Sequence, residues 1–223
     1  MIASPEMAAI KKRIEQVGTP LREWDIAINY GIKTGFNEAF IIDGKKKDEL
    51  IAADPKSAEI IKPVLRGRDI KRYRVDFADL WLIVAKFGAY KSIPRDYPTI
   101  YRHLKQYEDK LKNRGQCRYT SSGKSKKGDY PGQHHWLELD NNPKDDYLDE
   151  FAKDKIVYAE IVFDSAFYFD TSGVYTEATA FVLTGEHTNY LTALLNSELW
   201  FVTQMYARFS VEAGQPCSDR GFG

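Results

Sequence analysis

The chain has 223 residues, of which 43% are hydrophobic, and its 32 basic side chains balance its 32 acidic side chains. This length and composition predict one large globular domain, or one domain with an appended helical piece, and argue against intrinsic disorder. No apolar run approaches the roughly 18 residues of a transmembrane helix, and no export signal is visible. The two cysteines, Cys117 and Cys217, are far apart in the sequence, which argues against a disulfide framework and predicts a cytoplasmic protein.

The balanced net charge conceals an uneven distribution along the chain. Six Lys or Arg residues lie between positions 62 and 74, where Asp69 is the one acid, and residues 91–127 carry a net charge of +8. Residues 129–164 carry a net charge of −7. If folding keeps these tracts apart, the molecule can present a positive face to phosphates while it stays neutral overall. The alternative interpretation is that the solvated faces of helices are simply charged.

The first part of the chain mixes short helices and strands. Apolar residues at spacings of three and four predict an amphipathic helix over residues 5–17, and alternation predicts a strand over residues 24–28. A second strand is expected over residues 39–42, closed by a turn at Asp43-Gly44. Asp54-Pro55 is typical of a helix start, because an acid can cap a helix and proline is favoured at its first position. Residues 66–69 predict a tight connection.

The second part contains a long loop between residues 113 and 132, rich in Gly, Ser and Lys, and such loops are usually functional or disordered. The other predicted elements are a buried strand over 80–85, a helix from 98 to 111, strands over 155–163, 166–169 and 179–183, and a helix over 188–209. Because strands and helices do not alternate strictly, we predict an α+β fold. The expected architecture is a mixed, mainly antiparallel sheet flanked by helices, with an N-terminal helix and a long C-terminal helix.

The sequence contains no convincing catalytic or metal-binding motif. Gly123-Lys124-Ser125 lacks the upstream glycine of a phosphate-binding loop, since Arg118 stands at that position. His134, His135 and Cys117 lack the paired spacing of a zinc site. The acids around Glu108 fall on an amphipathic helix, rather than at a strand end where they could hold a divalent cation. We therefore predict no catalytic residue and no metal ligand.

Two stretches have the composition of a nucleic-acid contact. Residues 31–40 join two predicted strands through glycines and present Lys33, Thr34 and Asn37, of which the asparagine amide can read adenine. Residues 61–73 present the basic side chains Arg66, Arg68, Lys71 and Arg72, and arginine is suited to bidentate contact with guanine or phosphate. Alternatively, the first stretch is a solvated loop, and Arg66 or Arg68 forms a structural ion pair with Asp69.

Three segments together resemble the TaqI-like C-terminal specificity domain family. They are Gly-Ile-Lys-Thr-Gly-Phe-Asn-Glu-Ala-Phe-Ile-Ile at 31–42, Asp-Pro-Lys-Ser-Ala-Glu-Ile-Ile-Lys-Pro-Val-Leu-Arg-Gly-Arg-Asp-Ile-Lys-Arg-Tyr at 54–73, and Tyr-Leu-Thr-Ala-Leu-Leu-Asn-Ser-Glu-Leu at 190–199. Such domains are the target-recognition parts of adenine-specific DNA methyltransferases, including fused bacterial restriction-modification enzymes. The resemblance runs from about residue 24 to residue 206. It implies that the chain binds double-stranded DNA and gives sequence specificity to N6-adenine methylation.

The resemblance also implies a division of the chain. Residues 1–20 would be a linker helix, residues 21–209 the DNA target-recognition domain, and residues 210–223 a poorly ordered tail. The nearest approach to the family's Asn-Pro-Pro-Tyr motif is Asn142-Pro143-Lys144-Asp145, which lacks the second proline and the aromatic residue. No S-adenosylmethionine site is recognisable either. We therefore expect S-adenosylmethionine to bind the methyltransferase catalytic domain of the same polypeptide, outside this chain.

On this interpretation, phosphate contacts position the duplex and a smaller set of side chains reads base edges. The residues expected to contact DNA are Lys33, Thr34, Asn37, Arg66, Arg68, Lys71 and Arg72 and, from the basic loop, Arg118, Lys124, Lys126 and Lys127. The catalytic domain would take a flipped adenine, so this chain needs no general acid, base or metal. The alternative hypothesis is a protein-interaction module without DNA binding, whose apolar stripes at 7–17 and 191–206 dock a partner subunit. A metal-dependent nuclease is a third hypothesis.

Overall fold

The computed structural model describes residues 5–117, 130–161 and 164–198. Its strands are β1 (Ile26–Tyr30), β2 (Ile41–Asp43), β3 (Ile61–Leu65), β4 (Ile70–Lys71), β5 (Arg74–Val75), β6 (Leu80–Ile83), β7 (Lys155–Ala159), β8 (Phe167–Asp170), β9 (Tyr175–Thr176) and β10 (Ala180–Gly185). They form two four-stranded sheets, ordered β1-β10-β7-β8 and β2-β6-β3-β9, and a hairpin of β4 and β5. These strands pair antiparallel except for β3 with β9.

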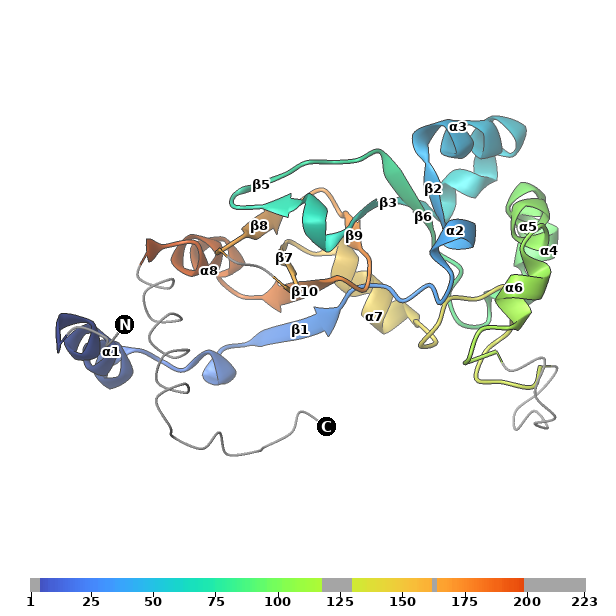
Figure 1. Cartoon of the computed structure of the whole chain (residues 1–223). Coiled ribbons are helices and arrows are strands. Elements are labelled where there is room, and N and C mark those ends of the chain that lie inside the picture. The colour runs from blue at the N-terminus through green and yellow to red at the C-terminus, as the bar shows by residue number, and fades with distance from the viewer. Residues whose placement is uncertain (1–4, 118–129, 162–163, 199–223) are drawn as a thin grey trace.

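The helices complete a mixed architecture and confirm the predicted α+β class. The α-helices are α1 (Pro5–Val17), α2 (Asn37–Phe40), α3 (Gly44–Ala53), α4 (Ile93–Asp96), α5 (Pro98–Lys105), α6 (Glu108–Lys112), α7 (Asp145–Asp149) and α8 (Thr188–Leu195). The 3-10 helices are η1 (Leu21–Glu23), η2 (Pro55–Glu59), η3 (Gly67–Asp69), η4 (Ala89–Lys91) and η5 (Glu150–Ala152). Figure 1 shows α3 to α6 gathered around the second sheet, whereas α8 accompanies the first. Within the described ranges, no helix is long and apolar enough to span a membrane.

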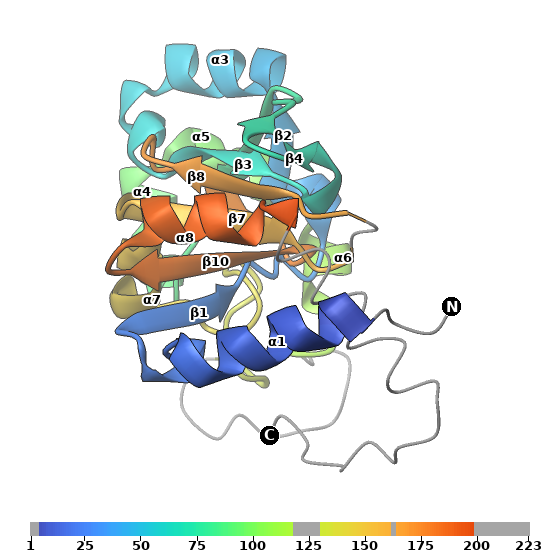
Figure 2. The same ribbon diagram turned by 90° about the vertical axis from the view of Figure 1, so that its left-hand side faces the viewer.

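The first sheet buries an apolar face beneath α8 (Figure 2). Ile156 of β7 and Leu183 of β10 form one buried cluster with Leu191 and Leu195, which are one helical turn apart on α8. The hypothesis that a stripe over 191–206 docks a partner is therefore wrong for its first two apolar residues, because they pack against the protein's own sheet. The part of the predicted C-terminal helix beyond residue 198 lies outside the described residues.

The second sheet forms most of the larger core. Leu82 and Ile83 of β6 are fully buried, and Ile100 and Leu104 of α5 belong to the same cluster. The two stretches predicted to contact DNA adjoin this sheet, because the first leads into α2 and β2 and the second continues from β3 into η3. The sheet and its helices thus provide a packed support for both.

Local sequence patterns predicted several element starts correctly. The helix over 5–17 is confirmed, and Asp54 caps η2 by accepting a hydrogen bond from the backbone N–H of Lys56. The predicted strand over 39–42 is partly wrong, because its first two residues complete α2. The predicted helix from 98 to 111 is two helices, α5 and α6, with a break after Lys105.

The elements that were not predicted include α3, α7, β3, the hairpin of β4 and β5, and β9. The signal for α3 was present but misread, since Asp43-Gly44 was interpreted as a turn. The Asp43 carboxylate instead caps α3 by accepting from the N–H of Lys46 at 2.7 Å, which is the ordinary role of an aspartate before a helix.

A buried arginine links the segment after α6 to the first of the two stretches predicted to contact DNA. Arg114 is 6% exposed, and its guanidinium donates to the carbonyl oxygens of Thr34 (2.6 Å), Trp136 (2.9 Å) and Glu138 (2.7 Å). It also pairs with Asp140 at 3.0 Å. These bonds compensate for the desolvation of the Arg114 guanidinium. Because one of them goes to the Thr34 carbonyl oxygen, the position of Thr34 depends on a residue 80 positions later in the chain.

Candidate nucleic-acid interface

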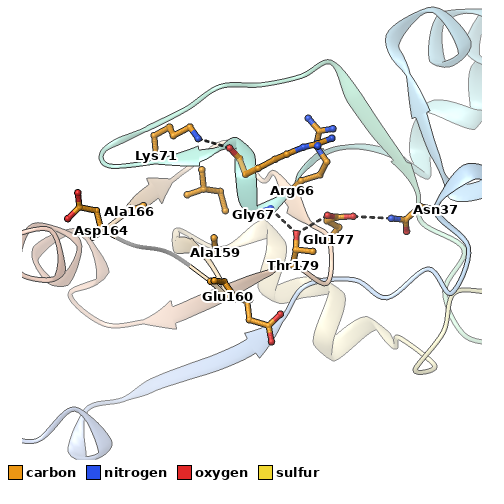
Figure 3. A pocket seen from close by; sticks show the side chains of 13 residues that line it. Asn37, Arg66, Gly67, Lys71, Ala159, Glu160, Asp164, Ala166, Glu177 and Thr179 are labelled. Atoms are coloured by element: carbon orange, nitrogen blue, oxygen red, sulfur yellow. Dashed lines mark hydrogen bonds between the residues drawn. The ribbon is translucent and has the colours of Figure 1, made fainter. Parts of the chain in front are cut away.

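A groove of about 720 Å³ brings together residues from both predicted contact stretches (Figure 3). Four predicted residues line it: Asn37, Arg66, Arg68 and Lys71. The other lining residues are Gly67, Ile70, Ala159, Glu160, Ile161, Asp164, Ala166, Glu177 and Thr179. One wall is therefore η3 and β4, and the facing wall comes from the ends of β7 and β8 and the segment between β9 and β10.

A chain of hydrogen bonds crosses the groove from Asn37 to η3 (Figure 3). The Asn37 amide nitrogen donates to Glu177 Oε2 at 3.1 Å, and Thr179 Oγ1 donates to Glu177 Oε1 at 2.7 Å. Thr179 Oγ1 in turn accepts from the backbone N–H of Gly67 at 2.9 Å. Three segments that are distant in sequence are thereby held at fixed relative positions.

Thr34 orients Asn37 rather than facing the groove itself. It is 3% exposed, and its hydroxyl donates to Asn37 Oδ1 at 2.5 Å while accepting from the backbone N–H of Phe36 at 3.1 Å. Since Glu177 accepts from the amide nitrogen, both ends of the Asn37 side chain have a protein partner. The amide is exposed and held in one orientation, as a side chain that reads a hydrogen-bonding pattern must be.

The two arginines that flank Gly67 differ in their partners. Arg66 donates to both carboxylate oxygens of Asp69, at 2.8 and 2.7 Å, and its backbone N–H donates to the same group at 2.9 Å. Burial by itself would raise the pKa of Asp69, but the hydrogen bonds from Arg66 outweigh it and hold the pKa below its ordinary value. Those same hydrogen bonds raise the pKa of Arg66. Of the two arginines considered as partners of Asp69, the structure thus pairs Arg66 with it.

Arg68 and Lys71 present their charges to the groove. Arg68 is exposed, and the Lys71 ammonium donates to its carbonyl oxygen at 2.7 Å. Arg72 lies outside the groove, at the turn between β4 and β5, where its guanidinium donates to the carbonyl oxygen of Asn196 at 2.5 Å. Arg68 is therefore the groove arginine whose guanidinium is best placed to reach a ligand.

The remaining predicted residues are not brought into this groove. Lys33 is exposed at a separate hollow, where its ammonium lies 5.8 Å from the centre of the Tyr30 ring. Arg118, Lys124, Lys126 and Lys127 lie outside the described residues. Among the residues that are described, no three His, Cys, Asp or Glu side chains gather as a metal site.

The basic tract of residues 91–127 and the acidic tract of residues 129–164 are not kept apart, as a molecule with one positive face would require. Arg114 of the basic tract forms an ion pair with Asp140 of the acidic tract. Glu160 and Asp164, also from the acidic tract, lie across the groove from Arg68 and Lys71. The groove therefore offers both cations and carboxylates, which suits base edges, where a carboxylate can accept from cytosine, better than phosphates alone.

Sequence reasoning missed the acceptor side of the groove, Glu177 and Thr179. They lie in a turn that the Ala180 N–H closes by donating to the Glu177 carbonyl oxygen at 3.0 Å, and no local pattern indicated that this turn faces Asn37. The contact between Asn37 and Glu177 spans 140 positions.

Comparison with known proteins places the chain in a protein family. The family described as "TaqI-like C-terminal specificity domain" matches residues 62–213. The chain is 28% identical over 92 residues to the type II methyltransferase M.MjaIV of Methanocaldococcus jannaschii, a match that covers 40% of this chain and 30% of the relative.

Two solved structures are also similar. The type IIL restriction-modification enzyme MmeI, determined in complex with DNA, has a TM-score of 0.52 at 15% identity, over 81% of this chain and 22% of MmeI. The type IIG restriction endonuclease BpuSI has a TM-score of 0.49 at 14% identity, over 89% of this chain and 23% of BpuSI. The likeness to MmeI is one of fold. The matched part of the chain thus covers less than a third of each of these proteins.

Proposed function

The chain belongs to the TaqI-like C-terminal specificity domain family, and from this we propose that it is a DNA target-recognition domain. It binds double-stranded DNA and gives sequence specificity to an adenine-specific DNA methyltransferase of a restriction-modification system. The observation that carries the proposal is the family match over residues 62–213. The groove between η3 and the ends of β7 and β8 supports it, because Asn37, Arg68 and the facing carboxylates have the hydrogen-bonding groups that distinguish bases.

The catalytic step is assigned to a different part of the same polypeptide. A methyltransferase domain would bind S-adenosylmethionine and the extruded adenine, because an enzyme that modifies a base must take it out of the stack. This chain would hold the flanking duplex and would supply no acid, base or metal. The matches to M.MjaIV and MmeI support the proposal, since the matched region accounts for 30% and 22% of those two proteins and leaves most of each for other parts of the enzyme.

A second surface favours protein contact, and we assign it to the catalytic domain. Helix α1 leaves Ile10, Ile14 and Val17 exposed at 41%, 37% and 64%. Spacings of four and three place them on one side of the helix, and clustered exposed apolar residues mark interaction sites. This contact would accompany DNA binding, whereas the alternative hypothesis was a protein-interaction module without DNA binding.

Titration of a short mixed-sequence duplex at two salt concentrations tests DNA binding. Wild-type affinity should fall as salt rises, because each phosphate contact releases counterions. Arg68→Ala should either reduce the salt slope by about one, as for a phosphate contact, or lower the affinity for particular sequences by about 1–3 kcal/mol, as for a base contact. Arg22→Ala is the matched control, since its side chain is 82% exposed and lies outside the groove. Absence of binding even at low salt would contradict the proposal.

A further inference from the structure

The β4–β5 hairpin carries a tyrosine in a backbone conformation that tyrosine rarely adopts. Lys71 pairs with Arg74, so Arg72 and Tyr73 form a two-residue turn. Tyr73 has φ = 61°. That left-handed position of a turn is normally occupied by glycine or asparagine, because a side chain there clashes with the backbone. The Tyr73 side chain is also 54% exposed, so burial of the ring in the protein core does not explain the choice.

The structure holds this turn firmly. The Tyr73 backbone N–H donates to the carbonyl oxygen of Phe167 in β8 at 3.1 Å, and the Asn196 side chain donates to the same oxygen at 2.8 Å. Arg72 donates to the carbonyl oxygen of Asn196 and lies 5.7 Å from the centre of the Tyr73 ring. Asn196, which is 1% exposed, belongs to the Leu-Asn-Ser segment at the end of α8. Strained residues that their surroundings hold in place occur disproportionately at functional sites.

The surroundings of the ring suit a nucleic acid. Ile70 and Lys71 of the same hairpin line the candidate groove, so the turn lies at its end. Arg72 and Arg74 flank Tyr73 in the sequence and are exposed, while Arg74 pairs with Asp76. An exposed aromatic ring between cationic side chains is the arrangement that stacks on bases next to a phosphate backbone.

We propose that Tyr73 is a base-stacking residue, which the hairpin presents and Asn196 holds in position. Its ligand is the face of a nucleobase that has lost a stacking neighbour in the bound duplex, as occurs next to an extruded base or at a kinked step. The inference rests on the proposed function, because it assumes that DNA lies along the groove. It explains why a tyrosine stands where glycine would be less strained.

The test uses the whole chain and two duplexes of the same sequence, one intact and one with a central abasic site that leaves the opposing base unpaired. Wild type should bind the interrupted duplex more tightly. Tyr73→Gly should weaken that complex by about 5- to 150-fold, the range for loss of one stacked base, and abolish the preference. Its melting temperature should stay the same or rise, because glycine accepts the left-handed backbone. Tyr73→Phe should keep the preference.

Tyr190→Ala is the matched control, because Tyr190 is 62% exposed on α8 and does not line the groove; it should bind both duplexes as wild type does. If Tyr73→Gly also binds both duplexes like wild type while Arg68→Ala weakens binding, the stacking inference is wrong and the proposed function stands. A parallel fall in melting temperature and affinity would mean that the tyrosine is structural, which also overturns the inference. If wild type binds neither duplex, both proposals fail.

A second measurement gives a direct readout of contact. Irradiation of the complex with 5-iodouracil at the unpaired position should cross-link the DNA to Tyr73, as located by mass spectrometry. Cross-links that form at other residues and leave Tyr73 unmodified would overturn the inference, and the alternative partner for the ring would then be the catalytic domain.

Discussion

Two arginines on either side of Gly67 have opposite environments, and this decides what each can do. Arg66 is held by two side-chain hydrogen bonds to Asp69, whose side chain is 6% exposed. Arg68 is exposed at the groove. A guanidinium already engaged by a buried carboxylate must break that pair before it can contact DNA, and breaking it leaves a desolvated charge.

Replacement of each arginine by alanine should therefore have separable effects. Arg66→Ala should lower the free energy of unfolding by about 1–3 kcal/mol, because Asp69 loses its charged hydrogen bonds. Arg68→Ala should change it by less than about 0.5 kcal/mol, as is usual for a surface substitution, and should weaken duplex binding. Urea denaturation and fluorescence anisotropy measure the two quantities. A stable Arg66→Ala variant with weakened binding would assign the DNA contact to Arg66 instead.

His134 is a buried imidazolium that makes stability depend on pH. Its Nδ1 faces the carbonyl oxygen of His135 at 2.9 Å and its Nε2 faces Asp140 at 3.0 Å, so both nitrogens meet acceptors and both carry protons. Burial alone would lower the pKa of His134, but the hydrogen bonds to Asp140, Cys117 and His135 outweigh it and raise the pKa to about 9.

Because the pKa is higher in the folded state, the proton stabilises the fold fully below about pH 6.5, and this contribution is lost as the pH rises towards 9. A shift of this size corresponds to about 3 kcal/mol. Denaturation series between pH 6 and pH 9.5 should show this fall in wild type and a flatter profile in His134→Gln. Cys117→Ala is the companion variant, because it removes the sulfur that lies 3.6 Å from His134 Nδ1 and leaves the imidazole and Asp140 in place. An unchanged slope in His134→Gln would refute the assignment.

At the scale of elements, the groove depends on a close approach between η3 and the segment that begins β10. A Cβ atom at Gly67 would lie 2.5 Å from the carbonyl oxygen of Thr179, and the Gly67 N–H donates to the Thr179 hydroxyl. Any larger residue must therefore push the two walls apart. The glycine is required here for space.

Gly67→Ala should accordingly destabilise the protein by about 1–3 kcal/mol, the usual cost of overpacking, and should weaken duplex binding by disturbing Asn37 through Glu177 and Thr179. Gly115→Ala is the matched control, since a Cβ there meets nothing within 4 Å. Thermal denaturation and anisotropy distinguish the two variants. Equal melting temperatures for both would show that the walls tolerate separation.

At the scale of the whole molecule, the proposed function predicts that this chain binds DNA weakly when no catalytic domain is present. We expect a dissociation constant of about 10⁻⁴ to 10⁻⁶ M at physiological salt, the range of non-specific binding. Methyl transfer should be absent, and both sequence specificity and methylation should appear when a catalytic domain is joined to the same polypeptide. Incubation of the chain with labelled S-adenosylmethionine and mixed-sequence duplex measures the transfer. Methyl incorporation above a protein-free control would contradict the assignment of methyl transfer to a separate catalytic domain.

Features that depend on near neighbours in the chain could be predicted from the amino-acid sequence. The apolar spacing of residues 5–17 and the capping pair Asp54-Pro55 act within one helical turn, so they predict α1 and the start of η2 directly. The polar composition of residues 31–40 and 61–73 likewise indicated which stretches to consider for DNA contact.

Which of those residues share a site depends on how the chain packs. The Asn37–Glu177 and Gly67–Thr179 contacts span 140 and 112 positions, and such separations carry no local pattern. Likewise, the choice of Arg66 over Arg68 as the partner of Asp69 depends on the turn geometry of η3. Lys33 lies at another hollow, which residues 140–144 also line, and Leu191 and Leu195 are buried because a sheet lies beneath α8. Hydrogen-bond partners and burial are properties of the packed chain, and these decide whether a charged or apolar residue is available to a partner.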